Sequence, residues 1–236
     1  MSSVFYFQQF SVDQTNCAMK INTDGILLGA TAFAEKSDKI LDIGTGTGVI
    51  ALMLAQRFPD AQIDAVEIDP ASAETAGQNF KNSPFSNRLQ IHPTSIQNFW
   101  LQKQHQQYDL IVSNPPFYLD SLTSPQENKT LAKHAAPQFF ENLLQNVPGF
   151  LTANGSLWII LPVKTASVVK ALAANQLFLQ HEIAVSSFKN EIPHRYILSF
   201  GLNRIKIKNE PFTIYADQKV YSGGYQTLLK DFLMIF

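Results

Sequence analysis

Short apolar runs and helix-like stretches alternate along most of the chain. The apolar runs have the length and composition of buried strands, and they lie at Lys39 to Ile43, Gln62 to Ile68, Arg88 to His92, Tyr108 to Ser113 and Gly155 to Leu161. The helix-like stretches lie at Val49 to Phe58, from Asp69-Pro70 onward, at about Pro137 to Val147 and at about Thr165 to Asn175. This alternation predicts an α/β fold, a mostly parallel sheet with helices on both faces.

Some element ends carry clear signals. Val49 to Phe58 is apolar almost all round, which suits a buried helix, and Pro59-Asp60 stops it. Asp69 is the expected N-cap of the next helix, with Pro70 at its first position. The polar stretch from Phe117 to Pro137 follows a strand end, and a long loop of this kind is typical of a lid or a binding loop.

The last third of the chain changes this rhythm. Leu179 to Val185 and Tyr196 to Leu202 look like two strands with a short loop between them, predicted to form an antiparallel hairpin at one edge of the sheet. The expected sheet therefore has seven strands. No linker rich in Pro, Gly or Ser divides the chain, so one domain over residues 1–236 is expected.

Composition supports a folded protein with an uneven charge. Apolar residues make up 45% and charged residues 16%, which argues against disorder, and the net charge of -1 argues against a uniformly basic surface. Residues 1–163 carry 9 Lys and Arg against 14 Asp and Glu, whereas residues 164–236 carry 9 against 5. The C-terminal excess is either chance clustering on solvated faces or a face that approaches phosphate.

Other compositional features exclude several classes. The single cysteine, Cys17, excludes an intrachain disulfide framework and a Cys-cluster zinc site, and the five histidines show no metal-ligand spacing, so no metal is expected. Residues 1–10 lack the pattern of a secretory signal, and no apolar run approaches the roughly 20 residues that span a bilayer. A soluble, cytoplasmic protein without an obligate protein partner is expected.

A glycine loop links the first strand to the first buried helix. It reads Leu41-Asp42-Ile43-Gly44-Thr45-Gly46-Thr47-Gly48, where glycines allow a tight turn and a ligand lying against the backbone. Glu67 ends the next strand, where a carboxylate can accept both hydroxyls of a ribose. A dinucleotide site needs Gly-x-Gly-x-x-Gly, but Val49 takes the third position. The loop instead resembles motif I of class I S-adenosylmethionine methyltransferases; glycines needed for packing alone remain the alternative.

A second motif, Asn114-Pro115-Pro116-Phe117, follows the fourth strand, beside the expected cofactor. The Asn114 side-chain oxygen and the Pro115 carbonyl could accept both N–H groups of a conjugated amino group, which frees its lone pair for attack. Phe117 or Tyr118 could stack on the planar ring. The tetrad resembles motif IV of the methyltransferases that act on amino groups of adenine, cytosine, guanine or glutamine, although a Pro-Pro turn can also simply end a strand.

A third stretch, Lys20 to Ala30, reads Lys-Ile-Asn-Thr-Asp-Gly-Ile-Leu-Leu-Gly-Ala. With the two motifs, it resembles the bacterial tRNA1(Val) adenine-37 N6-methyltransferase family over most of the chain. The resemblance implies a Rossmann-like class I methyltransferase, S-adenosyl-L-methionine as cofactor, and the anticodon loop of a valine tRNA as partner. Residues 1–38 would cover the cofactor site, and residues 39–236 would form the core with a C-terminal extension.

The resemblance also implies site residues. The catalytic tetrad is Asn114, Pro115, Pro116 and Phe117, and the cofactor set is Asp24, Asp42, Gly44, Gly46, Gly48, Glu67, Ser95 and Asn114. Asp24 could hold the cofactor's amino group or could instead cap a helix over Gly25 to Phe33. Ser95 replaces the acid that such enzymes commonly place after the third strand, so cofactor affinity is expected to be lower.

Basic residues flank the expected hairpin, with Tyr196 and Phe200 between them. They are Lys189, His194, Arg195, Arg204, Lys206 and Lys208. Such a strip suits single-stranded RNA, with Tyr118, Lys189 and Arg195 as the substrate contacts, although a charged, solvated edge strand explains it too. Alternative functions are amino-group methylation of ribosomal RNA guanine N2 or of protein glutamine N5, and an RNA-binding module without catalysis.

Overall fold

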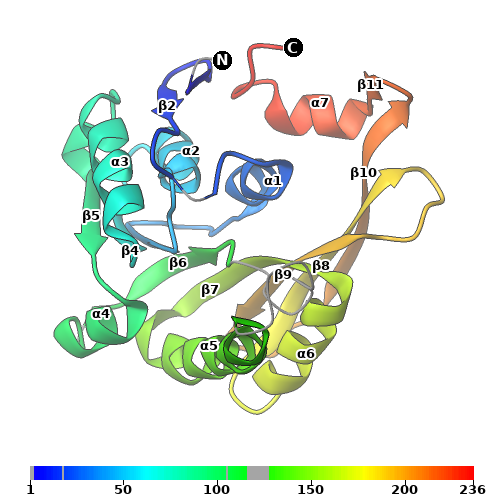
Figure 1. The fold of residues 1–236 in the computed structure, drawn as a ribbon. Helices are drawn as coiled ribbons and strands as arrows, with labels where there is room; N and C mark the ends of the chain where they lie inside the picture. The colour runs from blue at the N-terminus through cyan, green and yellow to red at the C-terminus, as the bar shows by residue number, and fades with distance from the viewer. Residues whose placement is uncertain (1–2, 18, 105, 116–127) are drawn as a thin grey trace.

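The structure is a computed structural model that describes residues 3–17, 19–104, 106–115 and 128–236, the stretch 128–137 by its backbone only. Its centre is a nine-stranded sheet in the order β11-β10-β8-β9-β7-β6-β3-β4-β5 (Figure 1). The strands are β3 (Lys39–Ile43), β4 (Gln62–Glu67), β5 (Leu89–Pro93), β6 (Tyr108–Ser113), β7 (Leu151–Pro162), β8 (Phe178–Phe188), β9 (Arg195–Gly201), β10 (Lys208–Asp217) and β11 (Val220–Tyr221). Most neighbours are parallel, while β9 and β11 run antiparallel to theirs. The predicted α/β class is confirmed.

The sheet is two strands wider than the predicted seven. The predicted hairpin forms, but β9 also pairs with β7, and the outer side of β8 pairs in parallel with β10. The hairpin is therefore internal, and β11 is the edge strand on this side of the sheet. The sequence pattern does not predict β10, because the strand is mostly exposed or half-exposed and contains Pro211, which has no N–H to donate to a neighbouring strand.

Helices cover both faces of the sheet (Figure 1). One face carries α1 (Thr23–Thr31), α2 (Val49–Arg57), α3 (Pro70–Lys81) and α7 (Gly223–Leu229), and a short 3-10 turn spans Ser86–Arg88. The other face carries α4 (Ile96–Gln102), α5 (Asn128–Phe150) and α6 (Val163–Ala173). Along β3, Ile40 packs into the first layer, while Leu41 and Ile43 pack into the second. Apolar side chains on both faces explain why such strands read as continuous apolar runs.

The two ends of the chain meet on the face of α1 and α7 (Figure 1). β1 (Val4–Tyr6) and β2 (Ser11–Asp13) form a separate two-stranded sheet. Phe7 makes a β-bridge to Leu233, and the Gln8 backbone N–H donates to the Phe232 carbonyl at 2.8 Å. The N-terminal segment is thereby packed against the C-terminal one, close to α1.

Two predicted element starts differ from the structure by four residues or more. α5 starts at Asn128, nine residues before the predicted Pro137, so the first part of this helix takes up nearly half of the predicted loop. The remainder of that loop, residues 117–127, lies outside the described residues. β7 starts at Leu151 instead of Gly155, and its polar first residues hid this extension from pattern analysis.

Candidate active site

A cavity of about 560 Å³ opens at the carboxyl ends of β3, β4, β5 and β6. The loops that follow these strands line it, together with residues 19–22 of the N-terminal segment and Phe139 of α5. The volume lies in the range of pockets that hold small molecules and cofactors. The position is the one at which open parallel sheets bind ligands.

The glycine loop forms one wall of this cavity. Gly44, Gly46 and Gly48 all have positive φ, of 72°, 56° and 83°. A Cβ at Gly44 or Gly46 would meet nothing within 4 Å, whereas a Cβ at Gly48 would lie 2.5 Å from Phe80 Cε1. The first two glycines therefore face the open cavity, and Gly48 is needed for packing of α2 against α3.

Glu67 fixes the shape of this loop from the end of β4. Its Oε2 accepts the Gly46 backbone N–H at 2.9 Å, and its Oε1 accepts the Asp69 backbone N–H at 2.9 Å. Each carboxylate oxygen can accept further bonds, so hydroxyl groups of a ligand can still bind Glu67. Asp69 caps α3 as predicted, because its side chain accepts the Ser72 backbone N–H at 2.8 Å.

Asp42 lies beneath the glycine loop, fully buried, and its Oδ2 accepts the Thr45 hydroxyl at 2.6 Å. Its Oδ1 has no hydrogen-bond partner among the residues that the structure describes. Burial raises the pKa of this carboxyl to about 7. Asp42 thus supports the loop from below, and the structure places it behind the cavity wall.

The residues that follow β4 and β5 give the cavity both apolar and polar lining. Ile68, after β4, is 71% exposed, and Thr94 and Gln97, after β5, also line the cavity. Ser95 accepts the Asn98 backbone N–H at 3.2 Å as the N-cap of α4. The structure therefore gives Ser95 a helix-capping contact and brings its neighbours Thr94 and Gln97 to the cavity.

Asn114 and Pro115 line the cavity directly after β6. The Asn114 Oδ1 is buried and has no hydrogen-bond partner in the described part of the chain. Ser113 ties the end of β6 to β3, because its hydroxyl donates to the Ile43 carbonyl at 3.0 Å. A buried acceptor without a partner costs free energy unless a ligand completes it, so Asn114 has the properties of a binding group. Pro116, Phe117 and Tyr118 lie outside the described residues.

Asp24 and Arg195, predicted separately as cofactor and RNA contacts, lie together. Arg195 Nε donates to Asp24 Oδ2 at 2.7 Å. The N-cap of α1 is Asn22, whose side chain accepts the Gly25 backbone N–H at 2.9 Å, so the alternative of Asp24 as the cap is wrong. Asn22 and Gly25 line the cavity.

The predicted basic strip is divided between two ends of the sheet. Lys189 is exposed in the turn after β8, at the carboxyl end of that strand, and Arg195 begins β9 beside it. The group from Arg204 to Lys208 lies at the opposite end, between β9 and β10. Phe200 is buried, which removes it from any RNA surface. The basic residues flank the hairpin as predicted, but they form two separate groups because β9 runs from one group to the other.

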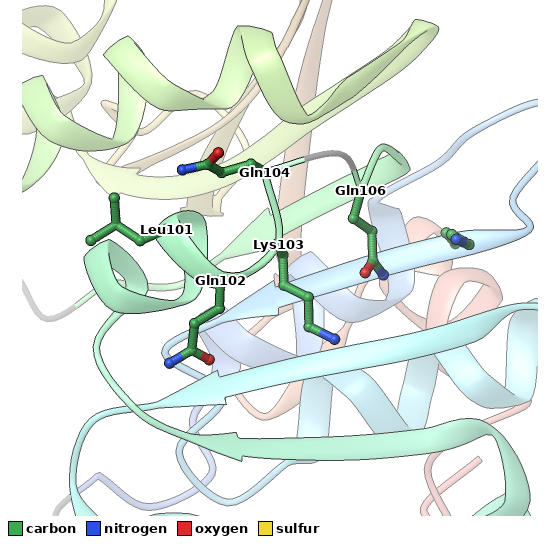
Figure 2. Close-up of a pocket in the computed structure, with 6 residues that line it drawn as sticks. Leu101, Gln102, Lys103, Gln104 and Gln106 are labelled. Atoms are coloured by element: carbon green, nitrogen blue, oxygen red, sulfur yellow. The ribbon is translucent and has the colours of Figure 1, made fainter.

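A second, shallow cavity of about 430 Å³ lies away from this site (Figure 2). It is lined by Lys39 at the start of β3 and by residues at the end of α4 and in the loop after it, such as Gln102 and Gln106. The start of β3 is the end of the sheet opposite the glycine loop. Its lining is polar and open, so it has no part in the first cavity.

Sequence reasoning missed several residues that line the main cavity. They are Lys20, Asn22, Ile68, Gln97 and Phe139. Ile68 follows Glu67 directly and could have been found as an apolar residue at a strand end that faces ligands. The others come from helices and segments whose approach depends on the whole fold.

Within residues 3–17, 19–104, 106–115 and 128–236, no group of three or more His, Cys, Asp or Glu side chains could hold a metal ion. In the same part of the chain, no helix has the length and apolarity needed to span a membrane.

The fold and this site define a class I methyltransferase. The methyltransferase small domain family model matches residues 17–190. A predicted O-methyltransferase from Agrobacterium tumefaciens has the same fold, with a TM-score of 0.71 over 89% of this chain and 96% of that chain at 15% identity. A ribosomal protein L11 methylase from Lactobacillus delbrueckii subsp. bulgaricus gives a TM-score of 0.55 over 80% and 83% at 16% identity.

Relatives of higher identity show which family within this class the chain belongs to. Proteins named tRNA1(Val) (adenine(37)-N6)-methyltransferase are 44% identical in Pedobacter heparinus, over 100% of both chains, and 39% identical in Flavobacterium psychrophilum, over 98% of this chain and 99% of that one. A third protein of this name, in Bacteroides thetaiotaomicron, is 37% identical over 98% of this chain and 97% of that one. The chain belongs to the tRNA1(Val) (adenine(37)-N6)-methyltransferase family.

Proposed function

We propose that this protein transfers a methyl group from S-adenosyl-L-methionine to N6 of adenine 37 in the anticodon loop of tRNA1(Val). The observation that carries the proposal is the Asn114 carboxamide, whose buried Oδ1 has no partner among the described residues and which lines the cavity beside the glycine loop. The family supplies the identity of the substrate, because full-length relatives carry that name. Such a substrate would place the protein in the cytoplasm.

The cavity fits S-adenosylmethionine. Gly44 and Gly46 leave open space where any Cβ would intrude, so a ligand can lie against the loop backbone. Glu67 offers carboxylate oxygens for ribose hydroxyls, and the exposed Ile68 offers an apolar surface for a flat ring. When bound, S-adenosylmethionine supplies an electrophilic methyl group. In this proposal three of the predicted cofactor residues act indirectly. Asp42 supports the glycine loop, Gly48 allows α2 to pack, and Ser95 caps α4.

Asn114 and Pro115 activate the substrate nitrogen in this proposal. An adenine amino group is a poor nucleophile because its lone pair is delocalised into the ring. If Asn114 Oδ1 and the Pro115 carbonyl accept its two N–H bonds, the lone pair is localised on nitrogen. No strong base is needed, since a proton can leave after the methyl group has transferred. Pro116 would stiffen the turn, and Phe117 or Tyr118 would stack on the adenine.

The RNA must deliver its base to Asn114 outside the stack. A base in an anticodon loop has to turn out of its neighbours to reach a cavity of this kind. Lys189, exposed at the carboxyl end of β8, is the proposed phosphate contact. Residues 1–236 are proposed to act as one domain, because Phe7, Phe10 and Ile26 of the N-terminal segment share a core with α2 and β7.

The test uses the purified protein, methyl-labelled S-adenosylmethionine and total tRNA from a bacterial strain without this methyltransferase. Digestion should release labelled N6-methyladenosine, and isolation of single tRNAs should trace it to the anticodon loop of tRNA1(Val). Label in ribosomal RNA guanine or in protein glutamine would overturn the substrate while retaining the amino-group chemistry. A chain that binds tRNA without transferring any label would overturn the enzymatic proposal.

A further inference from the structure

An ion pair joins the first turn of α1 to the start of β9. Arg195 opens β9 and is paired in register with Pro162, the last residue of β7, while Asp24 lies in the first turn of α1. Their side chains meet at 2.7 Å and are only 29% and 16% exposed. The two residues lie 171 positions apart, so the contact connects the N-terminal segment to the C-terminal half of the sheet.

A second arginine holds the other end of α1. Arg57 of α2 donates from Nη1 to the Gly29 carbonyl at 3.0 Å and to the Ala32 carbonyl at 2.5 Å. A cation at the last carbonyls of a helix and an acid in its first turn both favour the helix dipole. Gly29 also allows close packing, because a Cβ there would lie 2.9 Å from Met53 Sδ. The position of α1 is therefore set at both ends, and Arg195 sets the end that faces the cavity.

The first turn of α1 forms the surface behind Asn114. A Cβ built on Gly25 would lie 3.6 Å from Asn114 Nδ2, at ordinary van der Waals distance, so the Asn114 carboxamide lies beside the first turn of α1 with room for no more than a small side chain between them. Gly25 is buried and directly follows Asp24. A shift of this turn would therefore change the space in which the Asn114 side chain is oriented.

The environment of Arg195 favours a contact within the protein. Its Nε donates to Asp24, and its Nη1 donates to the His194 carbonyl at 2.9 Å. Two donors of the guanidinium are thus committed to a fixed geometry at a half-buried position. An exposed lysine such as Lys189 on the preceding turn lacks this burial and is better suited to a mobile phosphate backbone.

We propose that Arg195 and Asp24 are positioning residues for methyl transfer: their ion pair holds the first turn of α1 against Asn114, so that the carboxamide is correctly oriented for the substrate amino group. The inference rests on the proposed function of Asn114. It assigns the pair to orientation of the catalytic group, in place of a direct cofactor contact for Asp24 and an RNA contact for Arg195. A displacement of about 1 Å at such a group can reduce the rate of reaction roughly 100-fold.

The experiment is a double-mutant cycle on the full chain with R195A, D24N and the combined variant. Single-turnover methyl transfer at saturating tRNA and cofactor is measured first, followed by the KM for tRNA and the Kd for S-adenosylmethionine. Each single variant should lower the single-turnover rate by about 10- to 100-fold. The combined variant should be no slower than either single variant, because both changes abolish the same ion pair. R195K should recover part of the rate.

A matched control is the ion pair between Lys170 of α6 and Glu182 of β8, which is 2.9 Å long and 33% and 20% exposed. E182Q breaks a contact of similar length and burial away from α1 and should leave the single-turnover rate unchanged. Circular dichroism and thermal unfolding establish that each variant is folded. Should R195A fail to fold, the reversed pair D24R with R195D tests the same contact and should restore the rate relative to D24R alone.

Other results would overturn the inference. A higher KM for tRNA in R195A with an unchanged rate, and no effect of D24N, would make Arg195 an RNA contact. A higher Kd for S-adenosylmethionine in D24N, and no effect of R195A, would make Asp24 a cofactor contact. Additive losses in the combined variant would also contradict it. If the wild-type chain methylates a different amino group, the proposed substrate fails while the same cycle, run on that substrate, still decides this inference.

Discussion

The two sides of the active-site cavity are built by different kinds of contact. On the side of β3 and β4, the glycine loop and Glu67 are 21 positions apart, and backbone N–H groups make most of the bonds. On the side of α1 and β9, the Asp24–Arg195 pair joins residues 171 positions apart through their side chains. The first side can be recognised as a motif in the sequence. The second exists only once the fold has brought distant segments together.

The largest expected effect is that of a change at Asn114, which should reduce methyl transfer without reducing cofactor binding. N114A removes the proposed acceptor for the substrate amino group but leaves the glycine loop intact. We expect transfer to fall roughly 100- to 1000-fold while cofactor affinity changes little. Labelled transfer to tRNA and calorimetric titration with S-adenosylmethionine measure the two quantities. Activity equal to that of the wild type would contradict the mechanism.

Two glycine substitutions distinguish the glycine that is needed for helix packing, Gly48, from one that is needed for cofactor binding, Gly46. In G48A the new Cβ would lie 2.5 Å from Phe80 Cε1 at a φ of +83°, so we expect about 2–4 kcal/mol of destabilisation. In G46A the Cβ meets no atom within 4 Å, so only about 1 kcal/mol of backbone strain is expected, together with weaker cofactor binding. Urea unfolding and cofactor titration check both. Equal stability of the two variants would show that the Phe80 contact is unimportant.

The buried acid beneath the loop makes stability depend on pH. Burial raises the pKa of Asp42 from 3.8 to about 7 in the folded state. Between about pH 4 and pH 7 the folded state therefore binds more protons than the unfolded state, so this carboxyl makes the free energy of unfolding fall as pH rises through that window. D42N should lack this contribution. Urea unfolding from pH 4 to pH 8 measures it, and identical slopes for both proteins would contradict it.

The smallest expected effect concerns the exposed basic residues of the second side. K189A should raise the KM for tRNA roughly two- to five-fold and lower the salt dependence of binding by about one charge. K206A removes the same charge at the opposite end of the sheet, between β9 and β10, and should change neither quantity. Binding measured from low to moderate salt distinguishes them. Equal effects of the two variants would mean that RNA contacts both ends of the sheet.

The α/β class, most central strands and the glycine loop are predictable from the sequence because local pattern determines them. The predicted and observed bounds of β6 are identical, since a largely buried parallel strand is a mostly apolar run. β10 and β11 were missed because a half-exposed strand with Pro211 has no such pattern. β10 pairs with β8, and β11 pairs with β10, contacts that the local sequence does not encode.

The site was predictable to a similar extent. Gly44, Gly46, Glu67 and Asn114 all reach the cavity, as their motifs indicated. Asp24 was placed close to the cavity, but its contact with Arg195 could not be read from residues 171 positions apart. Ser95 illustrates the limit of alignment by position, because a hydroxyl at a strand-to-helix junction is equally suited to capping α4.

The contact between the N-terminal and C-terminal segments has a consequence for folding. Phe7 forms a β-bridge with Leu233, and the Gln8 side chain donates to the Leu233 carbonyl, 225 positions away in the sequence. Closing a loop of this length costs more conformational entropy than closing the short loops between neighbouring strands of the central sheet. The central strands can therefore pair before the two segments dock, and this docking is expected to be a late step of folding.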